Sequence, residues 1–389
     1  MKIFDKYKEK ILKIKNITSV GISNLTSNAI SGLFWIYLAS LLGTEKYGEL
    51  GYLLAIIGIL GGIASFGAAN TLLVYVPKGE KIQAVIFFVV LISGTIVGIT
   101  SYFIFQNESI LLYPLGYVIF SVVIFDLAGK KCFANYGKYM VLQRTLMVVL
   151  SLVLYKYQGI DGIIFGYSLS FFPFGILMYK SFRESKIDFS ILKGKMGFII
   201  NNYVKQILTI VNFNVDKLII FPFFGSSVLG PYQLGFQIFV LAMLVPNVVI
   251  QYTLPHDASG IKNLKLKKYT VLTSIIITII TISLSPIIIP QFLPKFDESI
   301  QVIQIMSLSF VPQSLSILYS SELLGSGRTK IILIATIISI STLSVGIILF
   351  GEKYGLFGIT VSFVIGKIAE FLFIHIKKDN LKHDFRTLS

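Results

Sequence analysis

Twelve long apolar runs dominate this chain of 389 residues. A helix needs about 20 mostly apolar residues to cross the hydrocarbon core of a bilayer, and the alternating pattern of a membrane β-barrel is absent. Charged residues make up 14% of the chain, which is too few to cover a soluble surface, because soluble domains carry about 25%. The sequence therefore predicts an all-α integral membrane protein. The expected spans are residues 18–42, 50–76, 82–105, 110–129, 139–156, 160–180, 198–224, 231–253, 269–290, 300–324, 330–350 and 356–376.

Lysine and arginine are distributed unevenly over the segments between these runs. Of the 34 Lys and Arg residues, 26 fall in the termini and one set of alternate loops, 4 fall in the other set, and 4 lie within spans. Because basic loops stay in the cytoplasm, this bias predicts twelve spans with both termini cytoplasmic, in the cytoplasmic (plasma) membrane. The net charge of +15 is then expected to face anionic lipid headgroups. A basic soluble module suited to nucleic acid is absent.

One short passage occurs twice. Residues 41–54 read LLGTEKYGELGYLL and residues 223–236 read FFGSSVLGPYQLGF, an offset of 225 − 43 = 182. Each copy has an apolar run that ends at Gly43 or Gly225 and a second glycine five residues later, at Gly48 or Gly230. We expect these glycines to form tight outer turns. The duplication predicts two like-oriented halves of six spans each.

A second repeated pattern precedes the last span of each half. Gly159-Ile-Asp-Gly162-Ile and Gly355-Leu-Phe-Gly358-Ile are separated by 355 − 159 = 196 positions. The expected organisation is a cytoplasmic amphipathic N-terminus, a lobe of six spans, a cytoplasmic linker, a second lobe of six spans and a cytoplasmic tail. Their residues are 1–17, 18–180, 181–197, 198–376 and 377–389.

The chain has few features of an enzyme. The turns are too short for a soluble catalytic domain, a nucleotide-binding loop is absent, and the single cysteine, Cys132, excludes an internal disulfide and a cysteine-based metal cluster. We therefore expect no catalytic residues, no resident metal and no cofactor, although coupling to H⁺ or Na⁺ stays open. A monomer is the expected state.

Polar residues within the spans are the candidates for function, because ionisable groups in hydrocarbon usually face a cavity or a partner. The seventh span carries Lys205, Thr209, Asn212 and Asp216 on one helix face, and Lys217 follows. The first span has Asn24 and Asn28 at a similar spacing. We expect these stripes to line a hydrated substrate cavity; the alternative is hydrogen bonding between helices.

Further charged residues lie in other spans. Asp126 and Glu322 lie at near-equivalent places in the two halves, as structural anchors or coupling carboxylates. Arg144 lies near the start of the fifth span and could extend to the inner surface. Lys367 either pairs with Glu370, three residues away, or faces the cavity.

The motifs resemble those of a known family. Leu42-Gly43 with Tyr47-Gly48 in the first half, and Asp216-Lys217-Leu218-Ile219 with Gly225 and Leu229-Gly230-Pro231-Tyr232 in the second, are similar to Wzx-type polysaccharide exporters of the multidrug/oligosaccharidyl-lipid/polysaccharide (MOP) superfamily. The resemblance covers nearly the whole chain in span number and symmetry. It implies a V-shaped, MATE-like pair of six-helix lobes around a central cavity, alternating access, and a lipid-linked sugar as substrate.

The expected function is therefore a flippase that moves a lipid-linked oligosaccharide across the membrane for polysaccharide biosynthesis. A cavity of this family is often cationic, and Lys205, Lys217, Arg144 and Lys367 would supply the charge. The first alternative is a cation-coupled drug or metabolite antiporter, which requires an essential carboxylate among Asp126, Asp216 and Glu322. An integral-membrane glycosyltransferase is disfavoured, since it needs large polar loops.

Overall fold

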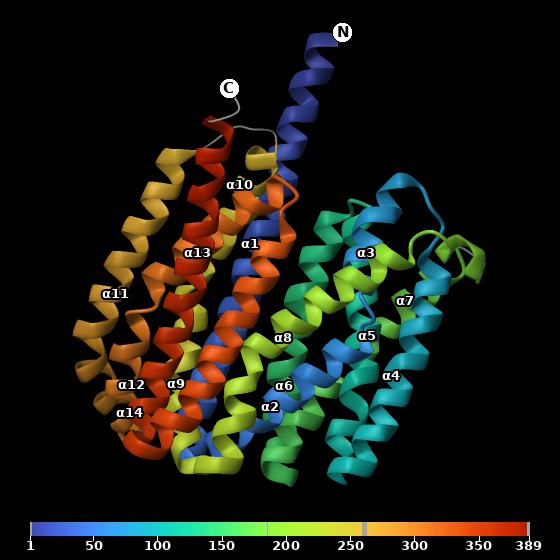
Figure 1. Ribbon diagram of the computed structural model, residues 1–389. Coiled ribbons are helices and arrows are strands. Elements are labelled where there is room, and N and C mark those ends of the chain that lie inside the picture. The colour runs from blue at the N-terminus through green and yellow to red at the C-terminus, as the bar shows by residue number, and fades with distance from the viewer. Residues whose placement is uncertain (1, 185, 259–262, 387–389) are drawn as a thin grey trace. The chain divides into compact units, whose positions relative to one another are not determined.

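The computed structural model describes residues 2–184, 186–258 and 263–386 (Figure 1). Within these ranges the chain forms α-helices and short 3₁₀ turns and contains no β-strand. Nine of the described helices are long and apolar enough to cross a membrane, and a bent pair makes a tenth span. The predicted all-α, multi-pass membrane fold is therefore confirmed.

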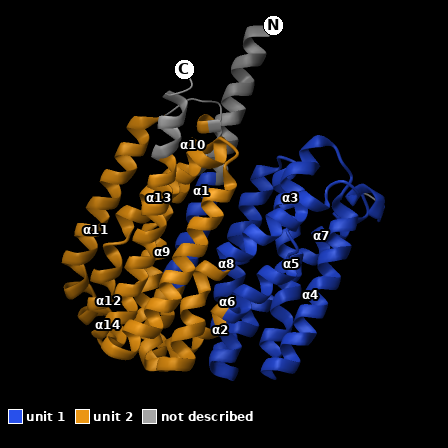
Figure 2. Ribbon diagram, in the orientation of Figure 1, with its two compact units in different colours: residues 1–34, 56–210 blue, residues 35–55, 211–389 orange. Residues whose placement is uncertain are grey.

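The helices pack into two compact units, each with its own core (Figure 2). Unit 1 comprises residues 1–34 and 56–210, and unit 2 comprises residues 35–55 and 211–389. Three long helices contribute to both units: α1 (Lys2–Leu42), α2 (Thr44–Ala64) and α8 (Met196–Phe224). Unit 1 also holds α3 (Ala68–Tyr75), α4 (Gln83–Phe105), α5 (Glu108–Gly129), α6 (Phe133–Leu169) and α7 (Gly175–Phe182). Unit 2 also holds α9 (Ser226–Ala242), α10 (Leu244–Ala258), α11 (Leu264–Phe292), α12 (Glu298–Ser307), α13 (Phe310–Gly325) and α14 (Thr329–Arg386).

These units differ from the predicted lobes in where three segments pack. Residues 35–55, from the end of α1 and the start of α2, pack with the second half of the chain. The first part of α8, up to residue 210, packs with the first half. The predicted linker at 181–197 divides the spans by their order in the sequence, and this division stays a prediction. By their contacts, both compact units include residues from before and after this linker.

Two helical stretches of 50 residues each, 133–182 and 329–378, contain a reversal. An uninterrupted helix of that length would extend about 75 Å, more than twice the hydrocarbon thickness. The backbone leaves the helical region at Gly159 (φ 62°, ψ −135°) and at Gly355 (φ 57°, ψ −138°), a conformation essentially restricted to glycine. Each stretch is therefore a pair of spans, so that ten apolar segments make twelve crossings.

The two arms of each reversal lie in close contact. A Cβ at Gly162 would lie 2.5 Å from the carbonyl carbon of Leu154, and a Cβ at Gly358 would lie 2.5 Å from that of Phe350. Only glycine permits this approach of two helices next to a one-residue turn. The repeated glycine pairs in the sequence thus mark two equivalent hairpins.

Several predicted spans are broken within their length. The predicted span 50–76 forms two helices, α2 and α3, because Phe66 and Gly67 have positive φ. The predicted span 231–253 is divided between α9 and α10 at Met243, and 300–324 is divided between α12 and α13. Apolar composition does not distinguish a continuous span from a broken one, so the sequence did not indicate these breaks.

The second span of each half also begins earlier than predicted. α2 starts at Thr44 and α9 at Ser226, directly after the single turn residues Gly43 (φ 77°) and Gly225 (φ 85°). The predicted turns from Gly43 to Gly48 and from Gly225 to Gly230 are therefore one residue long. The second glycine of each passage lies inside a helix and has another role.

Gly48 and Gly230 lie at a close crossing of α2 and α9 within unit 2. A Cβ at Gly48 would lie 2.8 Å from the backbone nitrogen of Gly230 and would overlap the carbonyl oxygen of Ser226. A Cβ at Gly230 would overlap the carbonyl oxygen of Thr44. The two copies of the repeated passage therefore pack against each other, main chain to main chain.

The outer faces of single helices are strongly apolar. On α11, Ile276, Ile279, Ile280 and Ile287 are exposed, and α4 exposes Ile92, Ile96, Ile99 and Phe103. In water such surfaces would favour aggregation, whereas in a bilayer the acyl chains cover them. These faces are the lipid-facing sides of the two units.

Candidate functional site

A buried ion pair lies on α8 inside unit 2. Asp216 is 0% exposed and Lys217 is 3% exposed. The Lys217 ammonium donates to Asp216 Oδ1 at 2.9 Å and to Oδ2 at 3.1 Å, and Tyr232 on α9 donates its hydroxyl proton to Oδ2 at 2.7 Å. The Lys217 backbone N–H also donates to Oδ1 at 2.9 Å. The carboxylate therefore has all of its lone pairs directed at donors.

Aromatic rings enclose this pair. The Lys217 Nζ atom lies 3.3 Å from the centroid of the Phe236 ring, a cation–π contact, and donates to the carbonyl oxygen of Phe213 at 2.7 Å. Phe363 on α14 packs edge-on against both Tyr232 and Phe236, with centroid distances of 6.4 and 6.1 Å. Water is thereby excluded from the pair.

A second pair of opposite charges lies nearby on α14. Lys367 and Glu370 are both buried, their charged atoms lie 3.7 Å apart, and Lys367 is 5.6 Å from the centroid of Phe363. The Lys367 charge repels that of Lys217. These four residues, with two positive and two negative charges, have no net charge as a group.

The cations of unit 1 have a different environment. Lys205 on α8 is half-buried and Arg144 on α6 donates to the hydroxyl oxygen of Tyr167 at 3.2 Å, while its Nε atom is buried without a hydrogen-bond partner. Tyr113 packs against Tyr167 with a centroid distance of 5.2 Å. In the part of the chain that the structure describes, neither Lys205 nor Arg144 has an acidic partner. The interior of unit 1 therefore carries uncompensated positive charge.

The predicted asparagines have three different environments. Asn24 is half-buried in unit 1, where its Oδ1 atom accepts a hydrogen bond from Tyr136 at 3.0 Å, and Asn28 is exposed. Asn212, on α8 in unit 2, has a buried Oδ1 atom without a hydrogen-bond partner. The predicted stripe on α8 thus crosses the boundary between the units after residue 210. That these side chains line one cavity stays a prediction.

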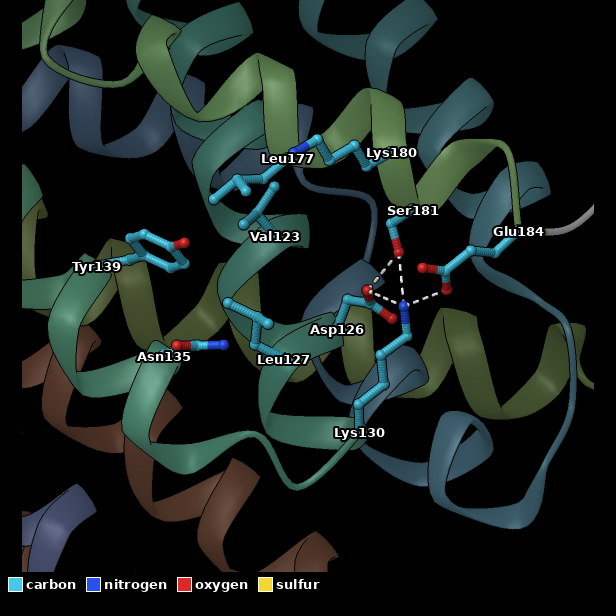
Figure 3. Close-up of a pocket in the computed structure, with 10 residues that line it drawn as sticks. All are labelled: Val123, Asp126, Leu127, Lys130, Asn135, Tyr139, Leu177, Lys180, Ser181 and Glu184. Atoms are coloured by element: carbon cyan, nitrogen blue, oxygen red, sulfur yellow. Dashed lines mark hydrogen bonds and ion pairs between the residues drawn. The ribbon is translucent and has the colours of Figure 1, made fainter.

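Asp126 belongs to a polar cluster at the end of α5 (Figure 3). Lys130 lies 2.9 Å from Asp126 and also pairs with Glu184, while Ser181 on α7 donates to the buried Asp126 carboxylate. Burial acts to lower the pKa of Lys130, but the hydrogen bonds to Glu184 and Asp126 outweigh it and raise this pKa above its ordinary value. The cluster borders a pocket of about 170 Å³ that Asn135, Tyr139 and Lys180 also line.

Glu322 has a similar arrangement in unit 2. Lys267 on α11 lies 2.9 Å from Glu322 and 2.8 Å from Asp257 on α10, and Lys378 on α14 lies 2.9 Å from Glu322. Asp126 and Glu322 are related by the offset of the repeated hairpins, 322 − 126 = 196. Each connects neighbouring helices at one end of its unit through lysine. Both predicted roles, structural anchor and coupling carboxylate, stay predictions.

Sequence reasoning identified the charged residues and offered the pairing of Lys367 with Glu370 as one of two alternatives, but it missed the other partners. Asp216, Lys217 and Lys367 are brought together, whereas Asn24, Asn28, Lys205 and Arg144 belong to the other unit. Tyr232, whose hydroxyl completes the Asp216 site, lies in the repeated passage and could have been noted there. The lysine partners of Asp126 and Glu322 have no such signal in the sequence. They lie in loops and at helix ends, where lysine indicates only which side of the membrane the segment faces. Among the described residues, no group of three or more His, Cys, Asp or Glu could hold a metal ion.

Comparison with known proteins identifies the fold. No protein-family model matches the chain. An uncharacterized membrane protein of Methanocaldococcus jannaschii is 25% identical over 90% of this chain and 94% of its own length. The structure of a multidrug resistance MATE family transporter of the MOP superfamily, in its inward-facing conformation, is similar over 92% of this chain and 96% of that one, with 17% identity and a TM-score of 0.69.

A further solved structure has the same architecture. A MOP-superfamily transporter from Pyrococcus furiosus is similar over 95% of this chain and 96% of that one, with 17% identity and a TM-score of 0.63. The similarity is near-complete in both directions. The protein is a multi-pass membrane protein with the fold of the MATE transporters of the MOP superfamily.

Proposed function

We propose that this protein is a transporter that flips an anionic lipid-linked oligosaccharide across the cytoplasmic membrane. The observation that carries the proposal is Lys205, a half-buried cation in the first third of the apolar helix α8 that has no acidic partner among the described residues. An ammonium group at membrane depth is costly unless it meets an anion or water. A phosphate that joins a glycan to its lipid would supply this anion.

The sugar also explains the polar residues on the apolar helices α1 and α8. Its hydroxyl groups lose hydrogen bonds on entering hydrocarbon, at a cost of several kcal/mol for each group left without a partner. Asn28 and Thr209 are exposed amide and hydroxyl groups on α1 and α8, and the buried Oδ1 atom of Asn212 lacks a donor. Such side chains replace the lost hydrogen bonds, while the lipid tail stays in the bilayer. When these side chains are exposed first to one side of the membrane and then to the other, the sugar headgroup moves across.

The test uses purified protein in vesicles that contain a fluorescent, pyrophosphate-linked oligosaccharide lipid. We expect Lys205→Ala to slow transfer between leaflets at least about tenfold, because a hydrogen bond to a charged group contributes about 1.5 to 3 kcal/mol. Lys205→Arg keeps the charge and should retain most of the rate. Lys156→Ala, which removes an exposed lysine of unit 1, is the matched control. An unchanged rate in Lys205→Ala would contradict the proposal.

Cation-coupled antiport of drugs or metabolites is the second candidate, and the MATE fold is the observation that favours it. For the Pyrococcus furiosus transporter a different function is suggested from the reverse polarity of its binding pocket, so the fold alone does not select drug transport. In this chain Asp126, Asp216 and Glu322 are each paired with lysine. A coupling carboxylate must instead exchange its cation. Transport of a cationic drug that follows a Na⁺ or H⁺ gradient, and is lost in Asp216→Asn, would favour this alternative.

A further inference from the structure

The atoms around the Lys217 ammonium are the ligands of a monovalent cation. Two carboxylate oxygens of Asp216 lie at 2.9 and 3.1 Å, the carbonyl oxygen of Phe213 lies at 2.7 Å, and the ring of Phe236 lies below at 3.3 Å. Oxygen atoms of this kind coordinate hard cations such as Na⁺, and a ring face attracts a cation through its quadrupole. The site therefore has the chemistry of a cation site, with an amine of the chain inside it.

The Lys217 ammonium comes from the same helix as the oxygen atoms of Asp216 and Phe213 that surround it. Side chains at neighbouring positions of a helix do not face each other. Lys217 meets Asp216 because its long side chain turns back toward the N-terminal end of α8, where it also reaches Phe213 four residues earlier. Because all three residues belong to one helix of unit 2, the contact does not depend on any movement between helices.

The site is also closed. Both charged side chains are almost fully buried, and the Tyr232 hydroxyl occupies the remaining side of the carboxylate. The neighbouring Lys367 charge repels any additional cation. An inorganic ion could enter only if the Lys217 ammonium left.

We propose that Lys217 is a built-in counter-cation that permanently fills a monovalent cation site at Asp216, so that unit 2 requires no exchangeable Na⁺ or K⁺. Removing the amine while keeping the carboxylate should convert the site into one that binds an external monovalent cation. The buried Oδ1 atom of Asn212, on the same face one turn before Asp216, is a further oxygen available to such an ion.

The experiment measures thermal unfolding of the purified full-length protein in NaCl, KCl, methylammonium chloride and choline chloride at equal ionic strength. The wild-type protein should unfold at the same temperature in all four salts. Lys217→Ala should unfold at a lower temperature in choline, which is too large for the site. At about 100 times the dissociation constant, Na⁺, K⁺ or methylammonium should raise its midpoint by about 3 °C.

Two further variants separate site binding from general effects of salt. Lys217→Met fills the space without a charge, so it should be destabilised and should show no recovery in any of the salts. The double variant Asp216→Asn/Lys217→Met removes both charges and should recover stability in all four salts alike.

Each remaining outcome overturns the proposal. A wild-type protein stabilised by Na⁺ or K⁺ relative to choline would show that the site exchanges its ion. A Lys217→Ala variant that responds to none of the cations, or that folds in none of the salts, would show that the carboxylate is not a cation site. Because unfolding is measured without substrate, the result is independent of the flippase proposal.

Discussion

Replacing Gly230 by alanine tests the close crossing of α2 and α9. The added methyl group would overlap the Thr44 carbonyl oxygen and lie 2.8 Å from the Thr44 carbonyl carbon. Ordinary carbon contacts are about 3.5 to 4.0 Å, and the atoms it meets belong to the main chain, which cannot change rotamer. The two helices must therefore separate at this crossing, which also includes Gly51 of α2, where a Cβ would lie 3.0 Å from the side chain of Gln233 on α9.

Two opposing effects determine the size of the change. Overpacking a well-packed contact costs about 1 to 3 kcal/mol, and the upper end applies here because backbone atoms collide. Alanine in place of glycine inside a helix contributes about 1 kcal/mol in the other direction. We therefore expect Gly230→Ala to lower the free energy of unfolding by about 1 to 2 kcal/mol, a fall of about 1 to 2.5 °C in the midpoint.

Gly21→Ala is the matched control, since Gly21 is also within a helix and a Cβ there would meet nothing within 4 Å. Thermal unfolding in the same lipid nanodiscs should show a small rise for Gly21→Ala and a fall for Gly230→Ala. Adding Gly48→Ala to Gly230→Ala should cost less than the sum of the two single changes, because both act on one contact. A Gly230→Ala protein as stable as Gly21→Ala would refute the reasoning.

Two further changes test other features of the fold. Gly159→Ala should lower the free energy of unfolding by about 1 to 3 kcal/mol, measured by thermal unfolding, because its φ of 62° with ψ of −135° is strained for any residue with a Cβ; Gly197→Ala, at a helical position with open space around it, should not. Lys130→Ala should cost about 2 kcal/mol, because the buried Asp126 carboxylate loses its cation. Since the pKa of Lys130 is raised above 10.5, this contribution should be fully present at pH 7 to 9 and lost only as the pH rises through the raised value.

The measurement on Lys130→Ala has its own control. Lys138→Ala removes an exposed lysine from the same helix-end region and should change the unfolding midpoint little. Equal midpoints for Lys130→Ala and Lys138→Ala would show that the Asp126 cluster does not stabilise unit 1. A stability difference between the wild type and Lys130→Ala that disappears between pH 7 and 9 would contradict the direction of the pKa change.

The sequence predicted those features that depend on local composition. The apolar runs and the Gly159 and Gly355 patterns define where the chain crosses and reverses, because span length and positive φ are properties of short segments. The prediction that Gly48 is part of a turn was wrong. Gly48 lies against Ser226, and Gly230 lies against Thr44, so each glycine contacts a segment about 180 residues away in the sequence. No local pattern reports which distant backbone lies against a glycine.

The candidate site shows the same division. Helical periodicity placed Lys205, Asn212 and Asp216 on one face of the seventh span, and this relation depends only on spacing. The pairing of Asp216 with Lys217 was not predicted, because neighbouring positions diverge on a helix and only the bend of the lysine side chain brings the charges together. The arrangement of the four charges also depends on Lys367, which is about 150 residues away in the sequence.

The sharing of α1, α2 and α8 between the two units determines the order in which the protein can fold during synthesis. Residues 35–55 belong to unit 2, so side chains such as Leu38 and Leu50, fully buried there, leave the ribosome long before α9 exists to cover them. Unit 1 likewise cannot close until residue 210 has been made. Residues 35–55 must therefore remain in the membrane without their native contacts until the second half of the chain has been made.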